Sequence, residues 1–532
     1  MKTRAELHWG RLFRCYAERP ASIDAMFRAA VVRAPDREAV VDGAIRMTYA
    51  ELDRSVDALA GGLSRRGVSV GDRVAVMLPN CLEAVICVLA IARLGAAIVP
   101  IGTRLRRPEI MHILDDAQPA ALVYAESFES QIPGDAKWPD IAMRFCVGRT
   151  ATQAQAFDEL AAQDPFALTV SIPEEELYGI LYTSGTTGRP KGATLTHLGA
   201  VHSCLHWVDA LALPDGGKTV LCIPWSHVAG LCGVLLPFLH VNGCLVLMRE
   251  FDKRLFLQNA ERERIDHALL VPAMYGLCLL DPDFERFDLA RWKLGVYGSA
   301  PMPEATIRRF AQALPHLVMC NAYGATETTS PATIMPPGMG VTHSDSIGKV
   351  VRCGEIHVMN EDGVEVEPGE QGELWIGGPM VVTGYWRNPE ADAEAFKAGY
   401  WKSGDIGSID RDGFVRIADR KKDMINRGGF KVYPAEVENV LCEHAEVVEA
   451  AVVGRADEIL GERVVAFVHC KHPLTEDAVR QFCVSRLADY KVPDYVIVGV
   501  DAPLPRNANG KIQKQELRER AAQLPERRRR AS

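Results

Sequence analysis

The sequence predicts an α/β protein with a large N-terminal domain of βαβ units, a β-rich subdomain and a small α+β C-terminal domain. A chain of 532 residues exceeds what one hydrophobic core usually organises. In its first part, apolar runs of strand length alternate with helical patterns, which is typical of parallel βαβ units. A later region holds short strands and turn signals such as Arg411-Asp-Gly413, and a last group of helices and strands follows it.

Residues 48–124 contain the alternation. Thr48-Tyr-Ala-Glu51 is a capping box that opens a helix, and apolar residues recur at helical spacing from Leu52 to Leu63. Ligands of parallel sheets bind beyond the carboxyl ends of the strands, so we expect a site at that edge. The remaining expected elements are strands at 73–78, 96–100 and 121–124 and helices at 80–94 and 108–114.

Composition and charge narrow the functional class. A hydrophobic content of 48% with 24% charged residues is typical of a soluble globular protein, and a net charge of −9 argues against a nucleic-acid binder. The 14 cysteines have scattered spacings without a Cys-x-x-Cys pair, which indicates unpaired thiols in a reducing compartment. Glu83 and Arg93 interrupt the most apolar run, so it predicts a buried helix and strand. We expect a cytoplasmic protein without a signal peptide.

The most informative stretch is Tyr182-Thr-Ser-Gly-Thr-Thr-Gly-Arg-Pro-Lys-Gly192, which follows a predicted strand. Its hydroxyls, glycine backbone N–H groups and Lys191 suit a phosphate group. The stretch is not a Walker A loop, because Pro190 stands at the fifth position after Gly185 and Gly192 follows the lysine. It therefore predicts phosphate binding outside the P-loop fold, with a plain surface hairpin as the alternative.

A second motif is Asn321-Ala-Tyr-Gly-Ala-Thr-Glu327. Tyr323 offers a flat ring on which a purine can lie, and Thr326 offers a hydroxyl. Glu327 offers a carboxylate to Mg²⁺, a cation that prefers oxygen ligands. Taken alone, this motif is only a weak indication of a nucleotide site.

Further motifs lie in the last third of the chain. Trp401-Lys-Ser-Gly-Asp405 follows Thr383-Gly-Tyr-Trp386 in the β-rich region, and an aspartate after glycine, such as Asp405, is typical of a turn. The charged segment 419–422 has the length of a hinge and marks a domain boundary. Beyond it we expect a helix from Pro434 and strands at 447–453 and 463–468.

In their order and spacing, these motifs resemble the signature of the adenylate-forming superfamily. That superfamily includes acyl- and aryl-CoA synthetases, adenylation domains of peptide synthetases and firefly-type luciferases, and the resemblance spans nearly the whole chain. It implies an N-terminal domain of residues 1–418 that binds ATP and the acid, a hinge at 419–422 and a mobile C-terminal domain of residues 423–532. Lys422 would be the pivot of the hinge.

The resemblance also implies site residues. The expected catalytic residues are Lys511, Glu327, Thr186 and Lys191, with Glu327 as the metal ligand. The expected ATP-binding residues are Thr183, Ser184, Gly185, Thr186, Thr187, Gly188, Lys191, Asn321, Ala322, Tyr323, Gly324, Thr326, Asp405, Arg420 and Lys511. By the same resemblance, Asp405 would bind both ribose hydroxyls with its two acceptor oxygens, and Arg420 would reach ribose and phosphate. The acyl pocket would contain His227, Gly230, Gly298, Ser299, Ala300, Pro301 and Ala325, and the CoA segment would contain Gly428, Gly429 and Phe430.

The activity that the resemblance implies is AMP-forming ligation of a carboxylic acid to CoA, with ATP and Mg²⁺. The acid would first form an acyl-AMP and pyrophosphate, and the CoA thiol would then displace AMP. Two alternatives stay open, an adenylation enzyme that loads a carrier protein and a non-catalytic nucleotide-binding homologue. Luciferase-like oxidation is compatible with the motifs, although nothing in the sequence specifically indicates it.

The acid is less well defined by the sequence. Residues 225–230 contain no anionic side chain to pair with the ammonium group of an amino acid. Small residues, including Gly230, Gly298 and Ala325, suggest an open pocket, and apolar neighbours such as Leu231 and Met335 suggest an uncharged tail. We expect a medium- or long-chain fatty acid, or an aryl acid. A homodimer is expected only as a common property of the family.

Overall fold

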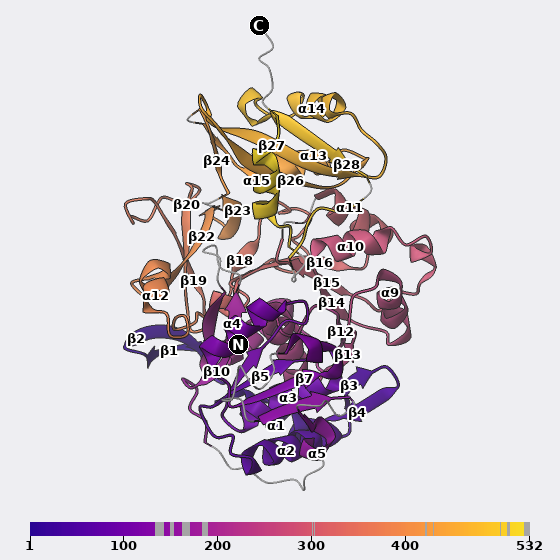
Figure 1. Ribbon diagram of the computed structural model, residues 1–532, viewed down its shortest axis with the longest axis vertical. Coiled ribbons are helices and arrows are strands. Elements are labelled where there is room, and N and C mark those ends of the chain that lie inside the picture. The colour runs from indigo at the N-terminus through magenta and orange to yellow at the C-terminus, as the bar shows by residue number, and fades with distance from the viewer. Residues whose placement is uncertain are drawn as a thin grey trace.

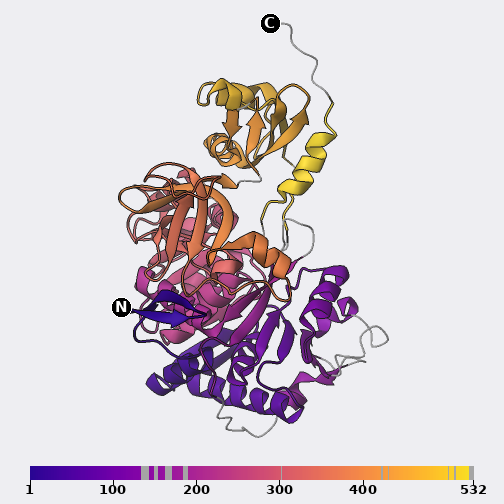
Figure 2. The ribbon, with the colours of Figure 1, turned by 90° about the vertical axis from the view of Figure 1, so that its left-hand side faces the viewer.

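The computed structural model describes residues 1–132, 143–148, 154–161, 171–183, 190–300, 302, 304–420, 423–428, 430–500, 502–507 and 511–525. Helices and mixed sheets alternate through a large body, and a smaller sheet with its own helices lies at one end of the molecule (Figure 1). Figure 2 shows the same C-terminal layer as a separate unit beyond the β-rich region. The predicted α/β class is therefore confirmed.

A seven-stranded sheet carries the first predicted βαβ units. Its strands β10, β6, β5, β7, β8 and β9 pair in parallel, and β11 pairs with β10 in the antiparallel direction. In spatial order the strands are β11 Lys191–Thr196, β10 Leu177–Thr183, β6 Ala97–Pro100, β5 Arg73–Met77, β7 Ala121–Ala125, β8 Met143–Val147 and β9 Gln155–Ala156. The strands expected at 73–78, 96–100 and 121–124 are thereby confirmed.

A second sheet of 14 strands joins the nucleotide-motif strands to the β-rich region. Its parallel part is β16 Val318–Tyr323, β15 Leu294–Gly298, β14 His267–Leu270, β12 Lys218–Leu221, β13 Cys244–Leu247 and β3 Glu38–Asp42, with β4 Ile45–Thr48 at the edge. Its antiparallel part is β17 Thr333–Ile334, β18 Gly348–Val350, β23 Phe414–Arg420, β22 Tyr400–Ile409, β20 Gly372–Gly377, β19 Glu355–Met359 and β21 Phe396–Lys397. The predicted β-rich region is thus hydrogen-bonded to the parallel sheet.

The C-terminal unit has a five-stranded sheet of its own. Its strands are β25 Phe430–Val432, β24 Ile425–Arg427, β27 Gly461–Cys470, β26 Val447–Asp457 and β28 Tyr495–Gly499. Its helices are α13 Pro434–Cys442, α14 Glu476–Val484 and α15 Lys514–Ala522, with the 3-10 turn η5 Asp489–Lys491. The helix expected at Pro434 and the two expected strands are present.

The helices of the body cover both sheets. They are α1 Ile23–Arg33, α2 Tyr49–Arg65, α3 Leu82–Arg93, α4 Arg107–Ala117, α5 Phe157–Ala161, α6 His197–Leu211, α7 Val228–Gly230, α8 Leu236–His240, α9 Lys253–Arg262, α10 Pro272–Leu279, α11 Glu304–Ala313 and α12 Pro389–Ala395. Shorter turns are η1 Glu126–Gln131, the π-helical η2 Leu231–Leu235, η3 Phe284–Arg286 and η4 Thr326–Thr328. Among the described residues, no helix is both long and apolar enough to cross a membrane.

Local sequence explains where α2 begins and how α3 is held. Thr48 and Glu51 form the predicted capping box, with Thr48 accepting from the Glu51 N–H and Glu51 accepting from the Thr48 N–H. Arg93 ends the buried helix α3, and its guanidinium pairs at 2.7 Å with each of Asp24, Asp53 and Asp57. Removing one partner of a buried ion cluster typically costs about 3–5 kcal/mol. Arg93 therefore ties α3 to α1 and α2.

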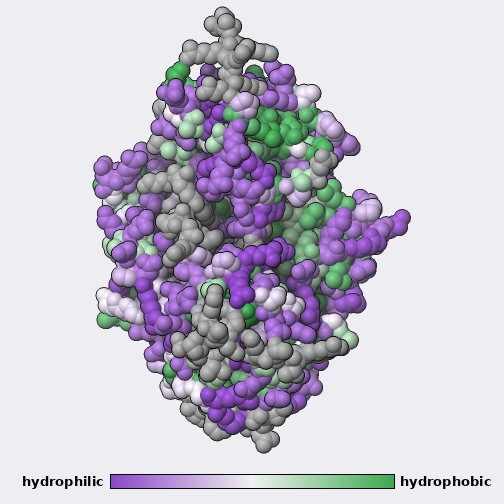
Figure 3. Space-filling view, viewed as in Figure 1, coloured by the Kyte–Doolittle hydropathy of each residue, from purple (hydrophilic) through white to green (hydrophobic). Residues whose placement is uncertain are grey.

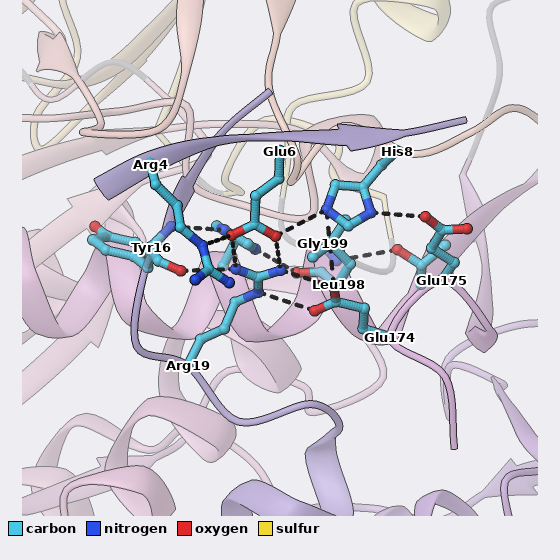
Figure 4. A network of polar contacts seen from close by, with 11 residues as sticks. Arg4, Glu6, His8, Tyr16, Arg19, Glu174, Glu175, Leu198 and Gly199 are labelled. Carbon is cyan, nitrogen blue, oxygen red and sulfur yellow. Dashed lines mark hydrogen bonds and ion pairs between the residues drawn. The ribbon is translucent and has the colours of Figure 1, made fainter. Parts of the chain in front are cut away.

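An N-terminal hairpin, which the sequence did not predict, packs beside the segment that leads into β10. It consists of β1 Thr3–His8 and β2 Arg11–Tyr16. The Arg19 guanidinium pairs with Glu6 at 2.7 Å and with Glu174 at 2.8 Å, and His8 Nδ1 lies 2.7 Å from Glu175 (Figure 4). Since Arg19 bonds both Glu6 oxygens, the cluster is an ion-pair network that fastens the hairpin to this segment.

The outer surface is mainly hydrophilic on the face seen in Figure 3. Apolar surface gathers on the right-hand side of that view, the side on which α10 lies in Figure 1. In that part of the chain Leu277 and Leu280 are exposed. Among the described residues, the buried hydrophobic side chains of the body form three clusters, and those of the C-terminal unit form two others.

Candidate active site

The predicted phosphate-binding stretch connects β10 to β11. Thr183 ends β10 and pairs in register with Lys191, which begins β11. Because β10 runs parallel to β6, the connection lies beyond the carboxyl end of a sheet strand, where ligands of such sheets bind. Ser184, Gly185, Thr186, Thr187 and Gly188 lie outside the described residues.

Lys191 and Glu327 both lie close to the side chain of Tyr385. The Tyr385 hydroxyl donates to Glu327 Oε1 at 2.8 Å, and Lys191 Nζ lies 5.4 Å from the Tyr385 ring centroid. Burial and the Glu327 carboxylate raise the pKa of Tyr385, so its hydroxyl stays protonated and donates. Lys191 also lies 3.9 Å from Glu394. The structure thus brings together the cation of the first motif and the carboxylate of the second.

The carboxylate of Glu327 suits a magnesium ion. Glu327 is buried in η4, and its Oε1 is already oriented by Tyr385. Its backbone carbonyl accepts from the Val382 N–H at 2.9 Å, which fixes η4 to the segment before Tyr385. A carboxylate fixed in this way matches the one or two carboxylate ligands that Mg²⁺ usually takes from a protein.

Tyr323 and Asp405 meet at a second point of the site. The Tyr323 hydroxyl donates to Asp405 Oδ2 at 2.5 Å, and the buried Asp405 receives its backbone geometry from Ser403, whose Oγ accepts from the Asp405 N–H. Arg420 lies directly opposite Asp405 in the antiparallel pair β22–β23. The predicted purine platform and the two predicted ribose residues therefore converge from three strands.

The rest of the second motif surrounds this point. Asn321 and Ala322 lie on β16, and Asn321 Nδ2 donates to the Ser346 carbonyl at 3.4 Å. Gly324 and Ala325 follow in the turn that leads to Thr326 and Glu327. Thr328 Oγ1 accepts from the Ala325 N–H at 2.9 Å and closes this turn.

His227 forms the N-cap of α7 and is neutral. Its Nδ1 accepts from the Ala229 N–H at 3.2 Å, which leaves the ring proton on Nε2. Burial, with the positive charge of Lys511 as a smaller cause, lowers the pKa of His227 to about 4. A ring with this pKa is a poor proton carrier at neutral pH, so its place fits a pocket wall better than acid–base catalysis.

Close backbone packing explains why two positions of the predicted acyl pocket are glycine. A Cβ on Gly230 would lie 2.2 Å from the Pro224 carbonyl oxygen, and one on Gly298 would lie 2.3 Å from the Ala322 oxygen. Neighbouring backbone therefore requires glycine at both positions, so their small size is not by itself evidence of an open pocket, and their place in the acyl pocket stays a prediction. Ser299 follows with a φ of 66°, and Ala300 is exposed. Pro301 lies outside the described residues.

Lys511 belongs to the C-terminal unit, and its charge affects His227 of the large N-terminal body. Its N–H donates to Asn507 Oδ1 at 3.0 Å, and the Asn507 N–H donates to the Lys511 carbonyl at 2.8 Å. Asn507, at a position where threonine is commoner in the resembled motif, therefore closes the turn that presents Lys511. Its charge is a smaller cause of the lowered pKa of His227, so Lys511 and His227 are close enough to interact electrostatically.

The predicted CoA segment forms a hairpin in the same unit. Arg427 pairs with Phe430, and Gly428 between them has a φ of 62°. The Phe430 ring is 57% exposed and stacks on Tyr490 with centroids 4.7 Å apart. Gly429 lies outside the described residues.

The predicted hinge straddles the end of β23. Asp419 and Arg420 are the last residues of this strand, and Lys422 lies outside the described residues. Asp419 Oδ2 accepts from the Ala435 N–H at 2.9 Å, at the N-terminus of α13. A residue of the large sheet thus caps a helix of the C-terminal unit.

Sequence reasoning missed Tyr385 as a site residue. It lies within the noted segment Thr383–Trp386, and its backbone bridges to Ala193 next to the phosphate stretch. The one feature of the sequence that could have indicated a role for Tyr385 is that its short aromatic segment lies between other motifs of the site. Nothing in it indicated contact with Glu327, which is 58 residues away.

Comparison with known proteins identifies the family of the chain. The AMP-binding enzyme family model matches residues 27–386, and the model of the AMP-binding enzyme C-terminal domain matches residues 436–511. The chain is 33% identical over 500 residues to the long-chain-fatty-acid–CoA ligase FadD13 of Mycobacterium tuberculosis, covering 93% of this chain and 97% of the relative. It is also 33% identical over 488 residues to feruloyl-CoA synthase of Amycolatopsis sp, covering 91% and 96%.

A solved structure supports the same relationship. The crystal structure of ATP-bound MatB from Rhodopseudomonas palustris matches with a TM-score of 0.85 and 30% identity, covering 94% of this chain and 99% of that one. The chain belongs to the AMP-binding enzyme family, in its acyl-CoA synthetase branch. It is accordingly an AMP-forming acid–CoA ligase that uses ATP and CoA, with Mg²⁺ as the typical metal of these enzymes.

Proposed function

We propose that the acid is an apolar monocarboxylic acid, either a medium- or long-chain fatty acid or an aryl acid. This proposal rests on the lining expected for the acyl pocket. There a neutral His227 is followed by the buried apolar residues Val228 and Leu231. A charged tail would lose its hydration there without gaining a partner. The relatives act on acids of both kinds by name, so they support the class but do not choose between them.

In the first half-reaction, a carboxylate oxygen of the acid attacks the α-phosphorus of ATP, and the bond to pyrophosphate breaks. Two anions must meet, so catalysis is mainly positioning and charge stabilisation. Lys511 would bridge the substrate carboxylate and the α-phosphate, and Lys191 with Thr183 would hold the pyrophosphate end. Glu327 would hold Mg²⁺, which when bound would supply positive charge against the phosphates.

Tyr323, Asp405 and Arg420 hold the nucleoside. The Tyr323 ring supports the adenine face while its hydroxyl orients Asp405. Asp405 accepts from the ribose hydroxyls, because a carboxylate presents two acceptor oxygens to two neighbouring donors. The cross-strand position of Arg420 supports its contact with ribose and phosphate.

In the second half-reaction, the CoA sulfur attacks the acyl carbonyl carbon, the C–O bond to AMP breaks and the thiol proton leaves to solvent. Gly428, Gly429 and Phe430 guide the pantetheine arm. They share one small domain with Lys511 but lie far from it in sequence, so rotation about residues 419–422 exchanges the two at the site. The influence of Lys511 on His227 supports assigning the described arrangement to adenylate formation.

The division into residues 1–418 and 423–532 is part of this proposal. The last strand of the large sheet ends at Arg420, and the first strand of the small sheet begins at Ile425, which supports a pivot between them. The Asp419 cap on α13 is one contact across this boundary, and Tyr433 OH, 3.1 Å from Gln371 Oε1, is another. These two hydrogen bonds between described residues would have to break or change when the domain turns.

The test is release of pyrophosphate and AMP from ATP and Mg²⁺ with a panel of fatty, aryl, dicarboxylic and amino acids, with and without CoA. Turnover that requires CoA and one apolar acid class supports the proposal and names the substrate. Preference for a dicarboxylic or amino acid refutes the substrate class. Pyrophosphate release that CoA does not increase favours an acceptor such as a carrier protein. If no acid of the panel releases pyrophosphate or AMP, a non-catalytic nucleotide-binding homologue is favoured.

We also propose a cytoplasmic location and a homodimer. The 14 cysteines are unpaired and 13 of them are buried, and burial raises the pKa of thiols such as Cys222, which supports a compartment where thiols stay reduced. The dimer rests on the family resemblance alone. Light scattering on the purified protein tests it, and a monomer at micromolar concentration would refute it.

A further inference from the structure

Helix α4 contacts both ends of the connection between β10 and β11. On one side, Asp116 Oδ2 accepts from the Tyr182 hydroxyl at 2.5 Å. On the other side, His112 Nε2 lies 2.9 Å from the Pro190 carbonyl oxygen and donates to it. His112 and Asp116 are four residues apart, so they lie on one face of the helix.

The two contacts lie next to the described residues that would hold phosphate. Tyr182 precedes Thr183 and Pro190 precedes Lys191, while Thr183 and Lys191 are themselves paired in register. The rings of His112 and Tyr182 also meet edge to face with centroids 6.3 Å apart. One helical turn of α4 therefore sets the spacing and direction of both strands where they enter and leave the connection.

The hydrogen bond between Tyr182 and Asp116 persists at neutral pH, and Asp116 also contacts a third segment of the chain. Burial and the hydrogen bond to Asp116 raise the pKa of Tyr182, so the phenol remains a donor at neutral pH. The Asp116 backbone carbonyl accepts from Trp386 Nε1 at 3.1 Å, and the Trp386 N–H donates to the Gly192 carbonyl at 2.7 Å. The segment that carries Tyr385 is thereby fastened to the same turn of α4.

We propose that His112 and Asp116 are positioning residues for ATP, which hold Thr183 and Lys191 at the spacing that the pyrophosphate end of ATP requires. This inference rests on the proposed function, in which these residues bind the β- and γ-phosphates. Preorganised donors lower the barrier because the protein need not reorganise when charge develops. Neither side chain reaches the nucleotide in this proposal, so both act through the strands that they hold.

The proposal makes a prediction that a general loss of stability would not. Only adenylate formation involves the β- and γ-phosphates, since acyl-AMP has lost them. Weakening the α4 contacts should therefore impair ATP use and leave the transfer of the acyl group from preformed acyl-AMP to CoA unchanged. A merely structural role would affect both half-reactions alike.

The experiment compares His112→Ala, Asp116→Ala and Tyr182→Phe with the wild type. The matched control is Asp115→Asn, which removes an exposed carboxylate from the same turn of α4. The first readout is kcat/KM for ATP in pyrophosphate release, and the second is single-turnover transfer from synthetic acyl-AMP to CoA. His112→Gln tests rescue, because its amide N–H can still donate to Pro190.

The expected loss in kcat/KM for ATP is roughly tenfold for each alanine variant, the size of one net hydrogen bond, with transfer from acyl-AMP changed by less than about twofold. Tyr182→Phe and Asp116→Ala should not add, because they remove the same bond. Unchanged ATP kinetics, or equal loss of both half-reactions, would overturn the inference. If an alanine variant fails to fold, Tyr182→Phe and His112→Gln decide the matter. A wild type without pyrophosphate release would refute the proposed function, and this inference with it.

Discussion

Tyr385 donates a hydrogen bond to Glu327 at 2.8 Å while Lys191 lies 5.4 Å above its ring centroid. The tyrosine therefore touches both the proposed metal ligand and the proposed phosphate-binding cation. A hydrogen bond to a charged group contributes roughly 1.5–3 kcal/mol, and here it also orients the Glu327 carboxylate that would hold the metal. We infer that the strength of magnesium binding depends on this contact.

Tyr385→Phe should raise the Mg²⁺ concentration needed for half-maximal pyrophosphate release by roughly tenfold, because it removes the hydroxyl and keeps the ring beneath Lys191. The measurement is a magnesium titration at saturating ATP and acid. The matched control is Tyr400→Phe, which breaks an exposed hydroxyl–carboxylate contact to Glu355, also 2.8 Å long. An identical magnesium dependence in Tyr385→Phe and wild type would contradict the role of Tyr385.

Tyr323→Phe tests the orientation of Asp405. The variant keeps a flat ring for adenine and loses the 2.5 Å bond to Asp405, so KM for ATP should rise roughly tenfold with little change in KM for the acid. Steady-state kinetics with each substrate varied in turn give both values. Asp405→Ala should have at least as large an effect. A normal KM for ATP in both variants would place the ribose elsewhere.

Lys511→Ala should separate the two half-reactions. Loss of a preorganised charge typically slows the affected step by about 10²–10³, and the affected step here is adenylate formation. Transfer from preformed acyl-AMP to CoA should continue at close to the wild-type rate. Rapid-quench assays of the two steps provide the comparison, with Lys471→Ala, an exposed lysine of the same domain, as the control. Equal impairment of both steps would refute domain rotation as the reason for the two roles.

Acid should destabilise the protein before its carboxylates titrate. Burial lowers the pKa values of His197, His202 and His227 to about 4 and of His267 to about 3. An unfolded histidine binds a proton near pH 6.5, so between about pH 6.5 and about pH 4 the unfolded state holds more protons than the folded state. The free energy of unfolding therefore falls as the pH falls through this window, by roughly 1.4 kcal/mol per pH unit for each such group.

Urea unfolding at several pH values between about 7 and about 5 measures this slope. His267→Gln should make the slope shallower, whatever it does to stability at pH 7, because the variant removes one titrating group. Glu6, whose pKa is lowered mainly by its hydrogen bond from Arg19, affects stability only below its ordinary value of about 4.5. A free energy of unfolding independent of pH above 5 would contradict the assignment of these histidines as buried and neutral.

Local patterns predicted the elements well, because their signals lie within one turn or one strand. The Thr48–Glu51 capping box fixed the start of α2, and the strands and helices from 73 to 124 fall close to where periodicity placed them. The order of the motifs was enough to predict a nucleotide site of the adenylate-forming kind. These inferences needed only neighbours in sequence or the resemblance of whole motifs.

Contacts between distant segments could not be predicted in this way. No sequence pattern pairs Tyr385 with Glu327, sets Arg420 opposite Asp405, or brings Asp116 of α4 to Tyr182. Each depends on strand register or on how a helix docks, which tertiary packing decides. The packing around Gly230 and Gly298 could not be predicted for the same reason, because only the folded backbone reveals how closely Pro224 and Ala322 approach them.

The measurement that tests the central claim most directly is the product balance of the wild-type enzyme with ATP, Mg²⁺, CoA and an apolar acid. Chromatography should show AMP, pyrophosphate and acyl-CoA formed in equal amounts, with acyl-AMP accumulating when CoA is left out. That result would establish an adenylate intermediate followed by transfer to the thiol. Formation of ADP and phosphate, or acyl-CoA without AMP, would contradict the account.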